Sequence, residues 1–192
     1  MKQRSLPQAG TLNTKIMNKL LYPLAAAVIL VASAFTFVTA QNWQIGDDYN
    51  IAFSNDEASG IFKGFKGVIA FDDNNPAASK FDVTIDVATI NTGNAMQNKH
   101  AKSDEWFDAT KYPTIHFVST KITKTASGYQ VAGNLQLHGI TKPVTIPFTF
   151  KHTGATGTFA GSFTVNRSDY QIGKPGGEVP EPVKIDISVP VK

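Results

Sequence analysis

The chain has 192 residues, a formal net charge of +3 and no cysteine. The absence of cysteine excludes disulfides, thiolate metal sites and a cysteine nucleophile. Four of the 18 basic residues and none of the 15 acidic residues lie in positions 1–40, so residues 41–192 hold 14 basic and 15 acidic residues, a net charge of −1. Residues 41–192 therefore carry no excess of positive charge to attract phosphates, and this removes the main driving force for nucleic-acid binding.

The N-terminal segment has the pattern of an export signal. Two lysines precede the apolar run of residues 20–38, and the small residues that a signal peptidase accepts end this run at Ala40. We therefore predict that residues 1–40 are a signal peptide cleaved near Ala40, and that residues 41–192 form a single domain in the periplasm or outside the cell. The run is also near the length of a membrane-spanning helix, so a retained anchor is the alternative.

Most of the remaining chain alternates between apolar and polar side chains with a period of two, which is typical of antiparallel strands with one buried face. The expected strands lie at 42–45, 49–53, 61–71, 81–87, 115–117, 129–137, 144–150, 159–165 and 183–191. Short turn sequences separate them, so sequence neighbours are expected to pair as hairpins in a meander. Seven to nine such strands must close on themselves or form two sheets. Pro147 and Pro190 cannot donate to a ladder, and they predict edges, a bulge or imperfect closure at their positions.

Residues 94–110 are the expected helical interruption of this all-β pattern. Asn94 is suited to cap a first turn, and Ser103 is suited to cap a second turn that begins with two acidic residues. Tyr112-Pro113 ends the segment, because a residue before proline resists the helical conformation. Residues 172–182 contain three glycines and three prolines, and this composition predicts a mobile loop.

The four histidines are the natural candidates for a metal site, but no two of them have ligand spacing. His138 and His152 fall on faces predicted to be exposed to solvent. His100 and His116 flank the helical segment and can meet in space, so each is a candidate for a polar contact with a ligand. We predict no metal and no cofactor.

The acidic residues of the helical segment do not require a catalytic role. Asp104 and Asp108 would share a helix face, as paired carboxylates must, but capping explains the first and ordinary solvation explains the second. Arg167 stands at the end of an apolar strand, where its guanidinium can pair with Asp169 or with an acid across the barrel, or contact a polar ligand head. Because no motif supplies an activated nucleophile, an enzyme is not expected.

Six segments match one protein family in their order and spacing. They are GIFKGFKG at 60–67, FDVTIDVATINTG at 81–93, His100 with SDEWFD at 103–108, KYPTIHF at 111–117, GNL with HGITKPV at 133–144, and NRSDY at 166–170. On these segments the chain resembles the YceI-like polyisoprenoid- and lipid-binding proteins. The resemblance implies an extended antiparallel lipocalin-like β-barrel of about eight strands, a short helical segment near 94–110, and an apolar cavity for an isoprenoid chain. Residues 54–58 and Trp106 depart from the family pattern.

The leading hypothesis is a periplasmic or secreted protein that holds a long-chain isoprenoid of polyprenyl or quinone type, as carrier or store, and that makes transient membrane contact. The side chains expected to line its cavity are Phe65, Ile69, Phe71, Val83, Ile85, Trp106, Phe107, Phe117, Val131, Leu135, Leu137, Ile146, Phe148 and Phe163. The expected polar contacts are His100, His116 and Arg167.

Two other hypotheses stay open from the sequence. One is a secreted β-domain with a filled core that acts through its surface, in adhesion or in a stress response. The other is an enzyme that uses His100 or His116 with a nearby carboxylate on a lipophilic substrate. The sequence names neither the ligand nor a partner that loads it, and it leaves the oligomeric state open, a dimer included.

Overall fold

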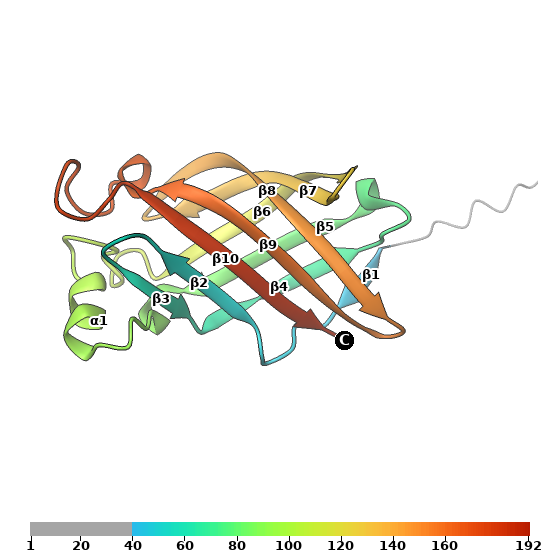
Figure 1. The fold of residues 1–192 in the computed structure, drawn as a ribbon, viewed down its shortest axis with the longest axis horizontal. Coiled ribbons are helices and arrows are strands. Elements are labelled where there is room, and N and C mark those ends of the chain that lie inside the picture. The colour runs from blue at the N-terminus through green and yellow to red at the C-terminus, as the bar shows by residue number, and fades with distance from the viewer. Residues whose placement is uncertain (1–39) are drawn as a thin grey trace, which may run out of the picture. The chain divides into compact units, whose positions relative to one another are not determined.

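The computed structural model describes residues 40–192, so the predicted signal peptide lies outside the described residues except for its last position. Within this described part, no helix combines the length and the apolar character needed to cross a membrane. The all-β prediction is confirmed: a single antiparallel sheet curls around a common interior, and its strands cross the molecule obliquely (Figure 1).

The sheet has ten strands where about eight were expected. They are β1 Gln41–Trp43, β2 Asn50–Ser54, β3 Ser59–Phe62, β4 Gly64–Phe71, β5 Lys80–Asp86, β6 Thr114–Thr125, β7 Gly128–Leu137, β8 Ile140–Thr153, β9 Thr156–Asn166 and β10 Pro182–Val191. The helical elements are α1 Ala95–Ala101 and three short 3-10 turns, η1 Pro76–Ala78, η2 Val87–Thr89 and η3 Arg167–Tyr170. Helix α1 and the loop after η3 lie at the same end of the long axis (Figure 1).

Strands β4 to β10 form the predicted meander, each pairing with the next. Of the N-terminal strands, β2 and β3 pair as a predicted hairpin, but β1 does not pair with β2 and β3 does not pair with β4, which corrects the prediction there. Strand β2 pairs with β10, with Ile51 opposite Ile187, and β3 pairs with β2. Strand β1 pairs with β4, and just beyond it Gln44 exchanges two backbone hydrogen bonds of 2.8 and 3.0 Å with Lys192 after β10. The N-terminal strands therefore bring the two ends of the curled sheet together.

The predicted strand 61–71 is in fact two strands, β3 and β4. The backbone amides of Lys63 and Gly64 donate to the Thr89 hydroxyl, at 3.2 and 2.9 Å, instead of to a neighbouring strand. The chain therefore leaves its partner β2 at this point and continues beside β5. The alternation changes phase at the break, because Phe62 of β3 and Phe65 of β4 both line the cavity although they are three residues apart.

The helical segment is shorter than predicted. The Asn94 side chain accepts hydrogen bonds from the amides of Met96 and Gln97, at 2.9 and 3.1 Å, so the predicted cap is confirmed. The second cap is wrong, because the Ser103 hydroxyl donates to the His100 carbonyl at 2.7 Å and the chain after α1 forms turns. The side chain that was expected to begin a second turn instead closes the end of the first.

Both prolines stand where a ladder ends, as predicted. The β8–β9 ladder reaches Phe148 opposite Gly161 and does not include Pro147. The β10–β2 ladder ends at Ser188, two residues before Pro190. The missing amide hydrogen of each proline therefore costs no hydrogen bond on that side.

An aromatic cluster fills the β1 end of the barrel. Phe71 at its centre is 1% exposed, and Trp43 donates its indole N–H to the Phe71 carbonyl at 3.1 Å. The rings that lie 5.1–6.0 Å from the Phe71 ring are those of Phe81, Tyr129, Phe148, Phe150 and Phe159. We call these seven residues the aromatic plug. Since it occupies this end of the interior, an internal cavity can extend only toward α1.

Candidate functional site

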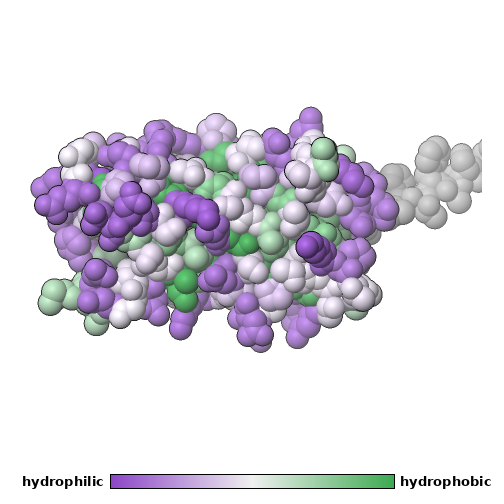
Figure 2. Space-filling view, viewed as in Figure 1, coloured by the Kyte–Doolittle hydropathy of each residue, from purple (hydrophilic) through white to green (hydrophobic). Residues whose placement is uncertain are grey.

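A cavity of about 680 Å³ occupies the half of the barrel nearer to α1. Its walls are inward side chains of the strands β2 to β10, and its floor includes three members of the aromatic plug, Phe81, Phe148 and Phe159. The lining is almost entirely hydrocarbon, and its volume lies within the range of ~300–1,000 Å³ that is usual for small-molecule sites. This inner face contrasts with the outside, where hydrophilic residues surround smaller apolar areas on the face in view (Figure 2).

The structure places every side chain that was expected to line the cavity in its wall, except Phe71. Phe71 points inward as predicted, but the other rings of the plug surround it and separate it from the cavity. The period-two pattern shows only that a side chain faces the interior. It does not show which part of the interior is filled, because that depends on the packing of rings from six strands.

Sequence reasoning missed the wall contributed by β2 and β10. Ile51 and Phe53 of β2, and Ile185 and Ile187 of β10, line the cavity. The alternation of β10 was visible in the sequence, but its pairing with β2 was not, so neither strand was placed beside the others. Residues 172–181, which we call the strap, also contribute Ile172 and Val179 to the lining, and their loop-like composition gave no signal of this.

The mouth of the cavity is formed by α1, the turn between β2 and β3, and the strap. Met96, which is 81% exposed, lies on α1 beside Gln97 and His100, and all three line the cavity. The indole N–H of Trp106 donates to His100 Nε2 at 2.7 Å. This bond ties the turn after α1 back onto the helix, with the Trp106 ring at the cavity wall.

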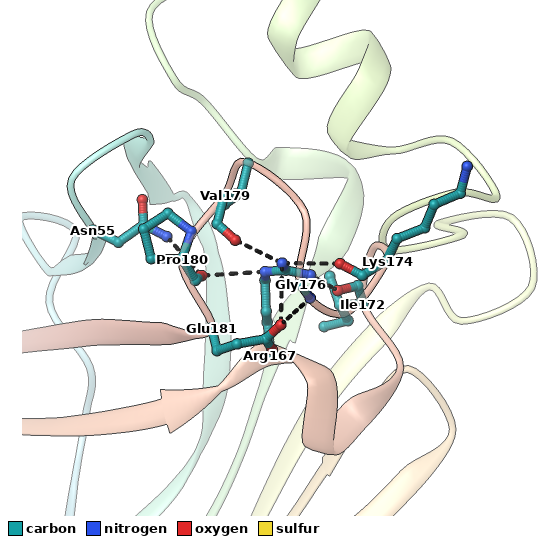
Figure 3. A network of polar contacts seen from close by, with 8 residues as sticks. All are labelled: Asn55, Arg167, Ile172, Lys174, Gly176, Val179, Pro180 and Glu181. Carbon is teal, nitrogen blue, oxygen red and sulfur yellow. Dashed lines mark hydrogen bonds and ion pairs between the residues drawn. The ribbon is translucent and has the colours of Figure 1, made fainter.

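Arg167 lies at the mouth and has a structural role, with Glu181 and not Asp169 as its acidic partner. It is 4% exposed, and its guanidinium donates to the carbonyl oxygens of Ile172, Lys174, Val179 and Pro180 at 2.6–3.2 Å (Figure 3). Asp169, its predicted ionic partner, instead pairs with Lys142 at 2.8 Å.

Glu181 of the strap also belongs to the Arg167 network. Its Oε1 lies 3.5 Å from Arg167 Nη2 and accepts from the Gly176 amide at 3.0 Å (Figure 3). The nearby Ser168 hydroxyl, then the Gly176 amide and the Arg167 charge, lower the pKa of the Glu181 carboxyl. The network holds the strap against the end of the barrel.

The other three histidines do not gather at the mouth. His116 does not line the cavity; its Nε2 lies 2.8 Å from Asp82 Oδ1, and this contact chiefly lowers the pKa of the Asp82 carboxyl. The meeting of His116 with His100 that the sequence left possible therefore does not occur at the cavity, because the inward positions of β6 before its bulge at Ser119–Lys121 are odd-numbered and His116 is even-numbered.

His138 and His152 were both predicted to face solvent, and the structure places them in different environments. His138 is partly buried rather than solvent-facing: its Nδ1 lies 2.9 Å from the Tyr170 carbonyl, and its ring packs edge-on against Tyr112. The sharp turn between β7 and β8 folds it inward. His152 stays largely exposed and stacks on Phe150.

The arrangement offers little for catalysis or metal binding. Within residues 40–192, no group of three or more histidine, aspartate or glutamate side chains converges to hold a metal. Asp104 and Asp108 share no helix face, because they lie in turns after α1 and Asp108 has a φ of 43°. His100 faces the cavity with an indole, not a carboxylate, as its partner. What the site can do is enclose a hydrocarbon chain.

The structure belongs to the class of antiparallel β-barrels that enclose an apolar cavity. Aromatic rings close one end of this barrel, and a helix and the strap bound the other end. The chain is a member of the YceI-like family, since residues 26–191 match the YceI-like domain.

Similarity to related proteins and solved structures supports this family membership. The chain is 36% identical over 136 residues to the UPF0312 protein YE1254 of Yersinia enterocolitica, and the match covers 68% of this chain and 71% of that protein. The crystal structure of Burkholderia cenocepacia BcnA has a TM-score of 0.73 and 31% identity, and the match covers 78% of this chain and all of that one. A polyisoprenoid binding domain from Saccharophagus degradans has the same fold, with a TM-score of 0.59, 13% identity, and coverage of 80% and 99%.

Proposed function

We propose that this protein is a binding protein, and not an enzyme, that holds a long-chain isoprenoid lipid of polyprenyl or quinone type in its barrel. The observation that carries the proposal is the cavity of about 680 Å³, whose walls are hydrocarbon from β2 to β10. A filled core, which the surface-acting alternative requires, does not fit a cavity of this size.

The energetics of such a cavity suit a carrier or a store. Each methylene that leaves water gains about 0.8 kcal/mol, so a long prenyl tail does not stay in water by itself. Its usual place is a membrane, which is as apolar as the barrel. Transfer from the membrane to the cavity is therefore nearly balanced in hydrophobic terms, and shape and head-group contacts decide the affinity. Transient contact with a membrane at the mouth completes the proposal.

The relatives support the choice of ligand class only in part. The Saccharophagus degradans domain is described as polyisoprenoid-binding, and at 13% identity its likeness to this chain is one of fold. It supports the idea that such a barrel can enclose an isoprenoid chain. The export pattern of residues 1–40 supports a periplasmic or secreted location, where the protein would exchange lipid with a membrane from outside the cytoplasm.

The test is to express the full chain in a bacterial host, recover it from the periplasm without detergent, and analyse it by mass spectrometry both intact under native conditions and after organic extraction. We expect a prenyl or quinone species at one copy per chain, and a polypeptide mass that begins at Gln41. A protein that carries no lipid and takes up no added polyprenol would contradict the proposal. A mass that retains residues 1–40 would contradict the proposed cleavage alone.

A further inference from the structure

We propose that the cavity selects ligands whose polar end is uncharged, such as a hydroxyl or a quinone carbonyl, and discriminates against the same tail ending in a phosphate. The inference rests on the proposed lipid-binding function and narrows its ligand class. It follows from two observations: most polar side chains at the mouth already form hydrogen bonds within the protein, and the charged side chain that has no partner there is a carboxylate.

The cation in the lining is not available to a ligand. Arg167 lines the cavity, but its Nε and both terminal nitrogens donate to strap carbonyls, and Glu181 lies against it as a counter-charge (Figure 3). An anionic head would have to displace carbonyl oxygens that are held at 2.6–3.2 Å. Those carbonyls would then be left without donors, and an unpaired buried carbonyl is unfavourable.

Two of the uncharged polar residues in the lining are engaged as well. The Asn55 side chain accepts from the amides of Glu57 and Ala58, at 3.1 and 2.8 Å, and donates to the Pro180 carbonyl. The Thr92 hydroxyl lies 2.9 Å from the side-chain oxygen of Asn98. These contacts shape the rim and leave little capacity for a ligand.

The groups that remain are the carboxylate of Glu57, the amide of Gln97 and the Nδ1–H of His100, whose Nε2 accepts from Trp106. All three residues line the cavity, and within residues 40–192 the side chains of Glu57 and Gln97 have no hydrogen-bond or ionic partner. They come from the β2–β3 turn and from α1, which lie at the same end of the barrel (Figure 1). A hydroxyl can donate to the carboxylate and a carbonyl can accept from the amide. A phosphate offers acceptors only and meets a negative charge.

The deep end of the cavity offers a charged head no alternative place, because plug rings form its floor. Lys99 of α1 and Lys102 just after it do not line the cavity, and the Lys174 ammonium lies 4.0 Å from the Glu105 carboxylate. Ions at such an exposed rim are hydrated and screened by salt, so they attract an anion only weakly. Among the charged side chains of the lining in the described part of the chain, the carboxylate of Glu57 is thus the one without a counter-ion.

Two probes with one tail, geranylgeraniol and geranylgeranyl monophosphate, test the inference on the full chain after lipid removal, with affinities measured by native mass spectrometry and fluorescence competition. At pH 7.5 we expect the alcohol to bind about tenfold or more tightly than the phosphate. Glu57→Gln should narrow this ratio, chiefly by improving phosphate binding. Glu178→Gln, which removes an exposed carboxylate from the strap outside the lining, should leave the ratio unchanged.

The outcomes separate this inference from the proposed function. If the phosphate binds as tightly as the alcohol or more tightly, the head-group selection is wrong and the lipid-binding function stands. If the preference for the alcohol is identical in Glu57→Gln, the role assigned to Glu57 is wrong. If neither probe binds, and longer polyprenols do not bind either, the proposed function itself fails.

Discussion

The Nη2 atom of Arg167 lies 2.6 Å from the carbonyl oxygen of Val179. The valine side chain lines the cavity, and the arginine begins the turn after β9. This contact therefore joins the mouth of the cavity to the rigid end of the barrel. A loop rich in glycine and proline thereby becomes part of the wall without forming a strand.

We expect the conservative change Arg167→Lys to loosen the strap. Lysine keeps the charge but has a single nitrogen, which cannot reproduce the planar fork of donors that contacts several carbonyls. The free energy of unfolding should fall by about 2–4 kcal/mol, because buried carbonyls lose their donors. Urea denaturation measures this loss, and hydrogen exchange should show faster exchange of the amides in residues 172–181.

Lys142→Met is the matched control for that change. It removes the exposed ion pair between Lys142 and Asp169 close to the same turn, and such pairs contribute about 0–1 kcal/mol. Equal effects of the two substitutions would show that the strap does not depend on the Arg167 hydrogen bonds.

Filling the cavity should block lipid binding without unfolding the protein. Val83 lines the cavity, so Val83→Trp places an indole in space that a ligand would occupy. Val68→Trp is the control, because Val68 lies on the neighbouring strand β4 and is 52% exposed. We expect the first variant to lose bound lipid in native mass spectra and the second to keep it. Retention of a full complement of lipid by Val83→Trp would place the ligand elsewhere.

Phe71, at the centre of the aromatic plug, should be important for stability and not for ligand contact. Phe71→Ala removes a 1% exposed ring from the centre of the plug, and such truncations cost about 3–5 kcal/mol. Phe163→Ala should cost less, since Phe163 is only partly buried and faces space that is already empty. Conversely, Phe163→Ala should change ligand affinity more than Phe71→Ala does. Chemical denaturation and probe binding, measured on both variants, check this prediction. It is contradicted if the variant that loses more stability also loses more ligand affinity.

The strap should respond to acid through Glu181. Its folded pKa lies below the ordinary value of 4.5, so the contribution of this carboxylate to stability is complete above that value and is lost as pH falls through the folded pKa. The difference in unfolding free energy between the unmodified protein and Glu181→Gln should therefore be constant near neutral pH and shrink in acid. Comparing the two proteins cancels the titration of Asp82 and Asp186, whose pKa values are also lowered.

Glu178→Gln serves as the control for this pH series, because Glu178 lies on the same strap and is exposed. Its unfolding free energy should follow that of the unmodified protein at each pH. If the difference for Glu181→Gln does not change between neutral pH and pH 3, the Glu181 contacts do not contribute to holding the strap.

Much of the barrel could be predicted from local pattern. Alternation located seven strands of the meander and the inward side chains on them, because the side-chain period of a strand does not depend on its partner. Asn94 could be read as a cap because capping is a contact between a residue and the next turn. The role of Ser103 could not be predicted, since its hydroxyl can either cap a following turn or donate back to the His100 carbonyl, and the course of the chain after α1 decides between the two.

The sequence by itself determined the β class, the inward faces and the family motifs, since all of these depend on neighbours along the chain. Tertiary structure alone decided three further features: the pairing of β2 with β10, the division of the interior into plug and cavity, and the use of Arg167 as an internal clamp. The first two depend on contacts between residues far apart in sequence. The third joins Arg167 to carbonyls only 5 to 13 residues away, but it depends on how the loop folds back. A guanidinium has the same chemistry whether it binds a ligand or a carbonyl, and only the path of residues 172–181 shows which acceptors reach it first.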